Sequence, residues 1–143
     1  MNTTPNLNIE GLVRIAESGA RAALKLGQDL QPVVIGSSKS GPIITAISGE
    51  KDDIPLGLRR VVDELKLERY VFVREARITA EPVWCLLLTL VDGESWSYLA
   101  AGIHTEANGQ REAGRLQAVT LAFDPIRDAI RDSINDGMTR VQA

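Results

Sequence analysis

Cysteine, histidine and aromatic residues are scarce in this sequence. It has one cysteine and one histidine, and phenylalanine, tryptophan and tyrosine together make up 4% of its 143 residues. A single cysteine forms no intrachain disulfide, and a structural zinc site needs about four cysteine or histidine ligands. The composition therefore excludes a disulfide scaffold and a structural zinc site, and we expect no metal and no cofactor.

Excess charge of one sign and long hydrophobic runs are lacking as well. The 16 Lys and Arg residues are balanced by 19 Asp and Glu, a formal net charge of −3, which gives no electrostatic reason to expect nucleic acid as a partner. The longest apolar stretch, residues 83–91, is far shorter than the roughly 20 residues of a membrane helix. The first six residues carry neither the basic start nor the apolar core of a secretion signal. We expect no nucleic acid and no membrane as partners, and a cytoplasmic location.

Length and composition are typical of one globular domain. Single domains usually hold about 100–200 residues, and the hydrophobic and charged shares, 44% and 24%, lie near the globular average. No internal repeat or long linker divides the chain. We predict one α+β domain over residues 1–143.

Hydrophobic spacing gives the order of the elements. Apolar residues at three-and-four spacing predict helices over residues 8–28, from residue 52 onward and after residue 124. Short β-branched or alternating runs predict a hairpin over 32–35 and 43–47 and a meander over 70–79, 83–91, 95–104 and 115–123, with 105–114 as a loop. Residues 83–91 are apolar on both faces, so we place them centrally. The predicted fold is an antiparallel sheet of about five to six strands with helices packed on it.

Two resemblances accompany this pattern. The order helix, hairpin, helix, meander, helix is similar to that of the profilin and roadblock/longin folds, which implies helices on an antiparallel sheet. The segment RYVFVREA at 69–76, a V-x-V-x-E-A strand after a helix, resembles a family of small uncharacterised prokaryotic proteins. That second resemblance implies a prokaryotic source and carries no activity with it.

His104 is the candidate catalytic residue. It ends a predicted strand beside a polar loop, which is where a general base would lie, and Glu106 or Glu112 could orient its imidazole. Such an enzyme would act on a small polar substrate. The alternative interpretation is an ordinary surface histidine.

Glu75 is a charged residue in an apolar strand. It alternates with Val71 and Val73, and Arg74 and Arg77 flank it. Such a residue marks a site or a buried ion pair, or it protects an edge strand against unwanted pairing. We favour the edge or sheet-surface interpretation, and keep all three charged residues as candidate binding residues.

Three aromatic residues could form a binding surface. Trp96 and Tyr98 share one strand face, and Trp84 lies on the neighbouring predicted strand. Gathered together, they would form an exposed patch or line a small-molecule pocket. The alternative, which we favour, is that they fill the core beneath a helix. Cys85 lies in the most apolar strand, so we expect an inert thiol with a raised pKa.

These observations favour binding over catalysis. We expect a non-catalytic interaction or scaffold module that forms a homo-oligomer or binds a partner protein, because the apolar central strand needs cover on both faces. A small enzyme using His104 and a small-molecule-sensing domain are the alternatives. Clustering of the polar candidates in one concave pocket would favour the enzyme.

Overall fold

The computed structural model describes residues 8–38, 41–47, 54–77 and 84–121. Their elements, in chain order, are α1 (Ile9–Lys25), β1 (Val33–Ser38), β2 (Gly41–Ala46), α2 (Ile54–Leu65), β3 (Arg69–Ala76), β4 (Cys85–Asp92), β5 (Ser95–Thr105), β6 (Arg111–Ala113) and β7 (Gln117–Val119). The start of the helix predicted from residue 52, the end of the strand predicted over 70–79 and the helix predicted after residue 124 lie outside these ranges.

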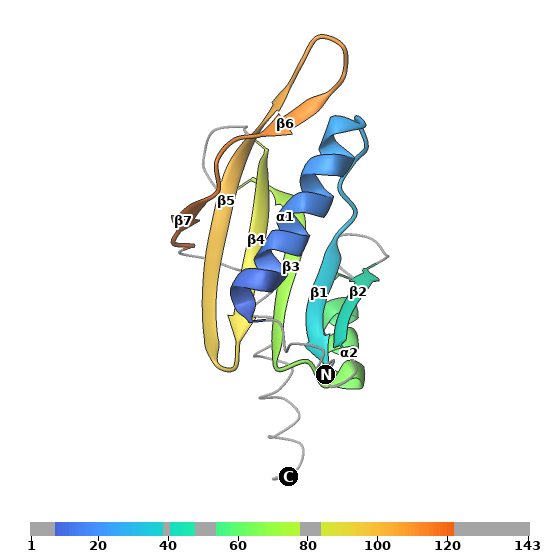
Figure 1. The fold of residues 1–143 in the computed structure, drawn as a ribbon, viewed down its shortest axis with the longest axis vertical. Helices are drawn as coiled ribbons and strands as arrows, with labels where there is room; N and C mark the ends of the chain where they lie inside the picture. The colour runs from blue at the N-terminus through green and yellow to red at the C-terminus, as the bar shows by residue number, and fades with distance from the viewer. Residues whose placement is uncertain (1–7, 39–40, 48–53, 78–83, 122–143) are drawn as a thin grey trace, which may run out of the picture.

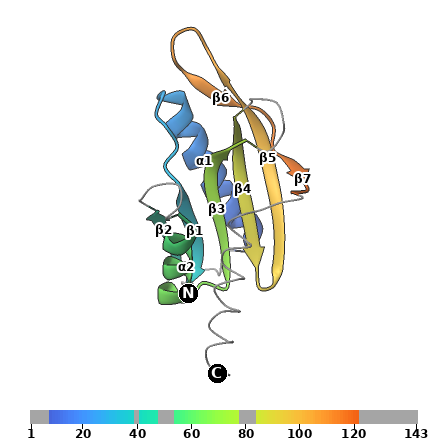
Figure 2. The same ribbon diagram turned by 180° about the vertical axis from the view of Figure 1, so that it is seen from behind.

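The strands form one antiparallel sheet. Their order is β2-β1-β3-β4-β5-β6, and β7 pairs with β5 as well. Helix α1 lies across one face of this sheet (Figure 1), and α2 packs on the opposite face near β1 and β2 (Figure 2). The α+β prediction is confirmed, with seven strands among the described residues instead of five to six.

Helix α1 begins and ends as its sequence predicts. The Asn8 side chain accepts a hydrogen bond from the Gly11 N–H at 2.9 Å, the bond expected of an N-cap. Gly27 follows the helix with a φ of 74°, a left-handed conformation that glycine adopts without strain. Helix α1 contacts β1, β3, β4 and β6, and its buried stripe consists of Leu12, Ala16, Ala20 and Leu24.

Strand β4 is the centre of the sheet. Leu86 and Leu88 point toward α1 while Leu87 points to the other face, and all three are completely buried. The prediction that this segment is covered on both faces is confirmed for the described residues 85–91. A tight turn follows β4, where Gly93 has a φ of 63° between the paired Asp92 and Ser95.

Helix α2 covers the lower part of the second face. Leu58 is fully buried and packs with Val34 and Phe72 of the sheet. Apolar spacing along this helix also predicts a buried Leu65, and that prediction is wrong, because the side chain is 37% exposed. The helix ends at that residue, the chain turns, and Leu67 enters the core in its place.

The predicted loop over residues 105–114 is partly wrong. Residues 111–113 form β6, which pairs with the end of β5. Gly109, with a φ of 86°, closes the turn between them. Of the predicted strand over 115–123, the described residues 115–121 contain the short β7. In the first hairpin the strand is longer than predicted. Residues 36–38, which lie between the two predicted strands, continue β1.

Candidate functional site

The structure does not bring the three aromatic candidates together. Trp84 lies just before β4, where its carbonyl oxygen accepts from the Ile103 N–H, whereas Trp96 pairs with Val91 at the other end of that strand. Seven residues of strand span roughly 23 Å. Tyr98 is 5% exposed and packs with Leu87 in the sheet. The described residues therefore hold no pocket lined by all three aromatic side chains.

Trp84 instead forms a contact with Arg77. The Arg77 guanidinium carbon lies 4.6 Å from the centre of the indole ring, a cation–π arrangement. The ring is 44% exposed, so this pair lies at the surface, at the upper end of β3 and β4. Arg74 alternates with Glu75 and therefore points to the opposite face of the sheet.

His104 lies on the hairpin formed by β5 and β6. Glu112 is its direct cross-strand partner, so the two side chains emerge on the same face of the ribbon. Glu106 follows at the start of the turn, and its N–H donates to the Gln110 carbonyl. All three candidate residues are exposed. The structure thus brings His104 and Glu112 side by side, on an open surface.

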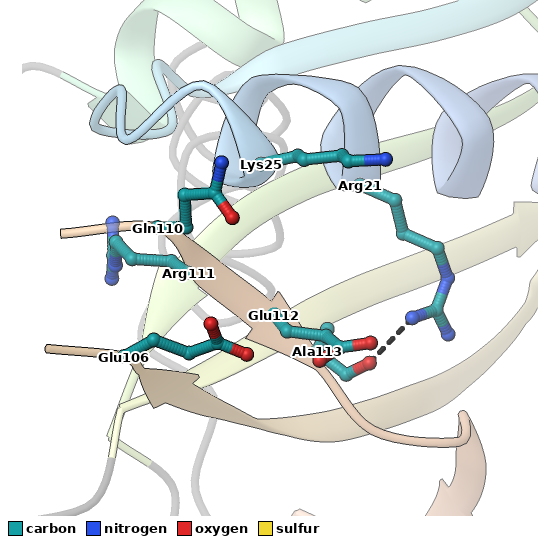
Figure 3. A pocket seen from close by; sticks show the side chains of 7 residues that line it. All are labelled: Arg21, Lys25, Glu106, Gln110, Arg111, Glu112 and Ala113. Carbon is teal, nitrogen blue, oxygen red and sulfur yellow. Dashed lines mark hydrogen bonds between the residues drawn. The ribbon is translucent and has the colours of Figure 1, made fainter. Parts of the chain in front are cut away.

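A cleft of about 210 Å³ lies between α1 and this hairpin. Figure 3 shows Arg21 and Lys25 reaching over it from α1, with the hairpin below. Its lining consists of Arg21, Lys25, Glu106, Gln110, Arg111, Glu112 and Ala113. His104 is not among these residues. The volume is below the roughly 300 Å³ at which ligand pockets begin.

Arg21 ties the two walls of the cleft together. Its guanidinium donates to the carbonyl oxygens of Ala113 and Gly114 on the hairpin, and it pairs with Glu17 one helical turn earlier at 3.0 Å. Three of its five N–H donors are thus used within the chain. Arg21 therefore holds α1 to the segment that ends the hairpin.

Glu75 and Arg111 form a bidentate ion pair, with the shortest nitrogen–oxygen distance among the ion pairs of the described residues. The two guanidinium nitrogens lie 2.7 and 2.8 Å from the two carboxylate oxygens, and the side chains are only 17% and 14% exposed. Glu75 also accepts from the Leu30 N–H at 3.1 Å. The pair joins β3 to β6, and through Leu30 to the segment after α1. It is a partly buried, bidentate pair.

The electrostatics of this pair follow from that geometry. The hydrogen bonds from Arg111 lower the pKa of Glu75, against the opposing effect of burial, and the Leu30 N–H lowers it further. In return, the hydrogen bond to Glu75 raises the pKa of Arg111. Both groups stay charged near neutral pH, so neither is available as a proton donor or acceptor.

The edge interpretation of Glu75 is wrong. Strand β3 lies between β1 and β4, and the carboxylate faces α1 in an ion pair. The partner is neither of the flanking arginines but Arg111, 36 residues away. Sequence reasoning missed Arg111 because it lies in the segment predicted to be a loop. Cys85 agrees with expectation, since burial raises its pKa.

The outer edge of β2 is the most exposed apolar feature of the sheet. Among the described strands β2 has a neighbour on one side only, β1. Ile44 is 65% exposed, and Pro42 and Ala46 are exposed as well. Strand β2 contains no charged residue, whereas edge strands usually carry charges that prevent pairing with other chains.

The register shows which backbone groups point outward. The Ile47 N–H donates to the Pro32 carbonyl at 2.8 Å, and bonded and non-bonded pairs alternate along an antiparallel ladder. Residues 43 and 45 therefore bond to β1, while the N–H and carbonyl groups of Ile44 and Ala46 point away from it. Pro42 occupies the same outward set, the one place where a strand tolerates a missing N–H.

Comparisons with protein-family models, with curated proteins and with solved structures found no match. The resemblances to profilin and roadblock/longin folds and to a prokaryotic family thus remain predictions. Among the described helices none is long and apolar enough to cross a membrane. Within the same residues, no three His, Cys, Asp or Glu side chains gather in a way that could hold a metal ion.

Proposed function

We propose that the protein is an interaction module that binds an extended segment of a protein partner along the outer edge of β2. In strand addition, backbone hydrogen bonds give affinity and alternate side chains give specificity. The edge of β2 offers both, because Ile44 and Ala46 present N–H and carbonyl groups outward and Ile44 adds an exposed apolar side chain.

The observation that carries this proposal is the exposure of Ile44 on an uncharged edge. A single exposed apolar residue is common on protein surfaces. An apolar edge strand with free backbone groups and no charge is different, because it pairs readily with other chains. A bound partner strand would bury both the side chain and the backbone groups.

The two alternative functions have less support. The cleft collects Glu106 and Glu112 with Lys25, but His104 lies outside its lining, so the proposed base and its substrate would lack a shared concave site. The sensing alternative needs an aromatic-lined pocket, and Trp84 and Trp96 lie at opposite ends of β4.

Titration of the ¹⁵N-labelled full chain with a short uncharged strand-forming peptide of alternating Thr and Val tests the proposal. We expect the largest amide shifts at Ile44 and Ala46. Ile44→Pro removes one of the two outward N–H groups without touching a bond to β1, so it should weaken binding and reduce the remaining shift at Ala46. Ile44→Thr keeps that N–H and should retain most of the shifts. Shifts centred on Lys25 and Glu112 instead, or none at all, would contradict the proposal.

A further inference from the structure

We propose that the occupant of this edge is a second copy of the same chain, paired β2 to β2 about a two-fold axis through Ile44. This inference rests on the proposed function and names its partner. A two-fold interface uses the same surface patch on both subunits. An edge strand paired antiparallel with its own copy meets that requirement directly and continues the sheet from one subunit into the next.

The backbone groups of the edge match themselves in this register. The Ile44 N–H would donate to the partner copy's Ile44 carbonyl, and the Ala46 N–H to its Pro42 carbonyl. Every outward N–H of residues 42–46 is then used, because Pro42 has none to leave unpaired. In this register the two copies of β2 overlap along residues 42–46. If Ile44 paired with the partner copy's Ala46 instead, the strands would overlap along a shorter stretch.

The side chains of the edge also suit a second copy. No charge lies within β2, so two copies meet without repulsion along the strand. The two Ile44 side chains come to lie directly opposite each other on the α1 face, where each now stands 65% exposed. In this arrangement each Ile44 side chain covers its counterpart at the proposed axis.

One strand pair buries less than the roughly 1,200 Å² of a standard interface, so the dimer is expected to be weak. Sedimentation equilibrium of the full chain from about 1 to 500 µM covers the micromolar dissociation constants expected of a weak dimer. We expect a concentration-dependent dimer with protected Ile44 and Ala46 amides. Ile44→Pro removes two of the four bonds between the copies and should raise the dissociation constant at least about tenfold, with Ile44→Thr, matched in thermal melting, as the control that keeps them.

Engineered disulfides test the register. Opposed residues of a bonded pair lie about 5.5 Å apart at Cα, within the span of a disulfide, so Ile44→Cys should form a covalent dimer on mild oxidation. Ala46 lies four residues from its own counterpart, roughly 13 Å, so Ala46→Cys should not. Crosslinking of both variants to the same extent would overturn the axis through Ile44.

Two further outcomes separate this inference from the proposed function. A monomer at every concentration that still binds the Thr-Val peptide would overturn self-pairing and leave strand docking intact. A monomer whose Ile44 and Ala46 amides resist exchange would show that the chain covers its own edge, and both proposals would fail.

Discussion

Replacing Arg111 by methionine is the sharpest test of what holds the β5–β6 hairpin to the body of the protein. The change removes both hydrogen bonds to Glu75, at 2.7 and 2.8 Å. It leaves a carboxylate that is 17% exposed, with the Leu30 N–H as its remaining partner. Methionine keeps most of the length and apolar bulk of the side chain, so the effect reports the lost charge.

The magnitude follows from burial. Removing one member of a fully buried pair costs about 3–5 kcal/mol, because the other charge is left uncompensated. Exposed pairs contribute about 0–1 kcal/mol. Glu75 and Arg111 lie near the buried limit but reach solvent, and Leu30 still bonds the carboxylate. We therefore expect Arg111→Met to reduce the free energy of unfolding by about 2–3 kcal/mol.

Urea denaturation measures this loss, and two variants control it. Arg59→Met breaks an exposed pair with Asp63, 3.5 Å apart, and should cost less than about 0.5 kcal/mol. The double variant Glu75→Gln with Arg111→Met removes both charges and should be more stable than Arg111→Met alone. Equal losses for Arg111→Met and Arg59→Met would refute the view that this pair holds the hairpin.

Three other predictions concern pH and the core. The folded-state pKa of Glu75 is lowered from 4.5, so the contribution of its carboxylate to the free energy of unfolding is complete above about pH 4.5 and is lost as pH falls through the folded-state pKa. In denaturation experiments from pH 7 to 3, the difference in stability between wild type and Glu75→Gln should therefore shrink. A constant difference would contradict the ion pair. Burial, aided by the charge of Asp63, raises the pKa of Tyr70 from 10.0 to about 12. The unfolded chain therefore loses this proton at a lower pH than the folded protein, and up to about 2–3 kcal/mol of the free energy of unfolding should be lost between about pH 10 and 12. Tyr70→Phe should lack this loss. Leu58→Ala should cost about 2–5 kcal/mol in urea denaturation, since the side chain is fully buried, and a cost under about 1 kcal/mol would show that α2 does not pack as described.

Local periodicity was sufficient for most of the fold. Helix α1 and strand β4 were predictable because each carries its whole signal within its own residues, as a stripe at helical spacing and as a run apolar on both faces. Strand β6 was not, since three residues around Arg111 show no period of their own. They become a strand because the Gly109 turn brings them against the end of β5.

The candidate site was harder to predict because it depends on pairs distant in the chain. The sequence showed that Glu75 shares a face with Val71 and Val73, and that much is confirmed. Its flanking arginines looked like natural partners. Strand alternation sends Arg74 to the opposite face, and Arg77 lies over Trp84, so neither pairs with it, and the partner comes from a hairpin whose register no local pattern encodes.

The edge position of β2 is the point at which local chemistry and topology agree. Either strand of the first hairpin could face outward, but Pro42 has no N–H and cannot serve an interior strand. Strand β1 is buried on both faces through Val34 and Ile35, so it takes the interior place beside β3. What remains is an edge that carries Ile44 and no charge to discourage pairing. Pro42 is one device that protects an edge strand, but the N–H and carbonyl groups of Ile44 and Ala46 still point outward beside an exposed Ile44 side chain. A partner strand would satisfy these groups, which is why we propose binding, and not catalysis, as the function of this protein.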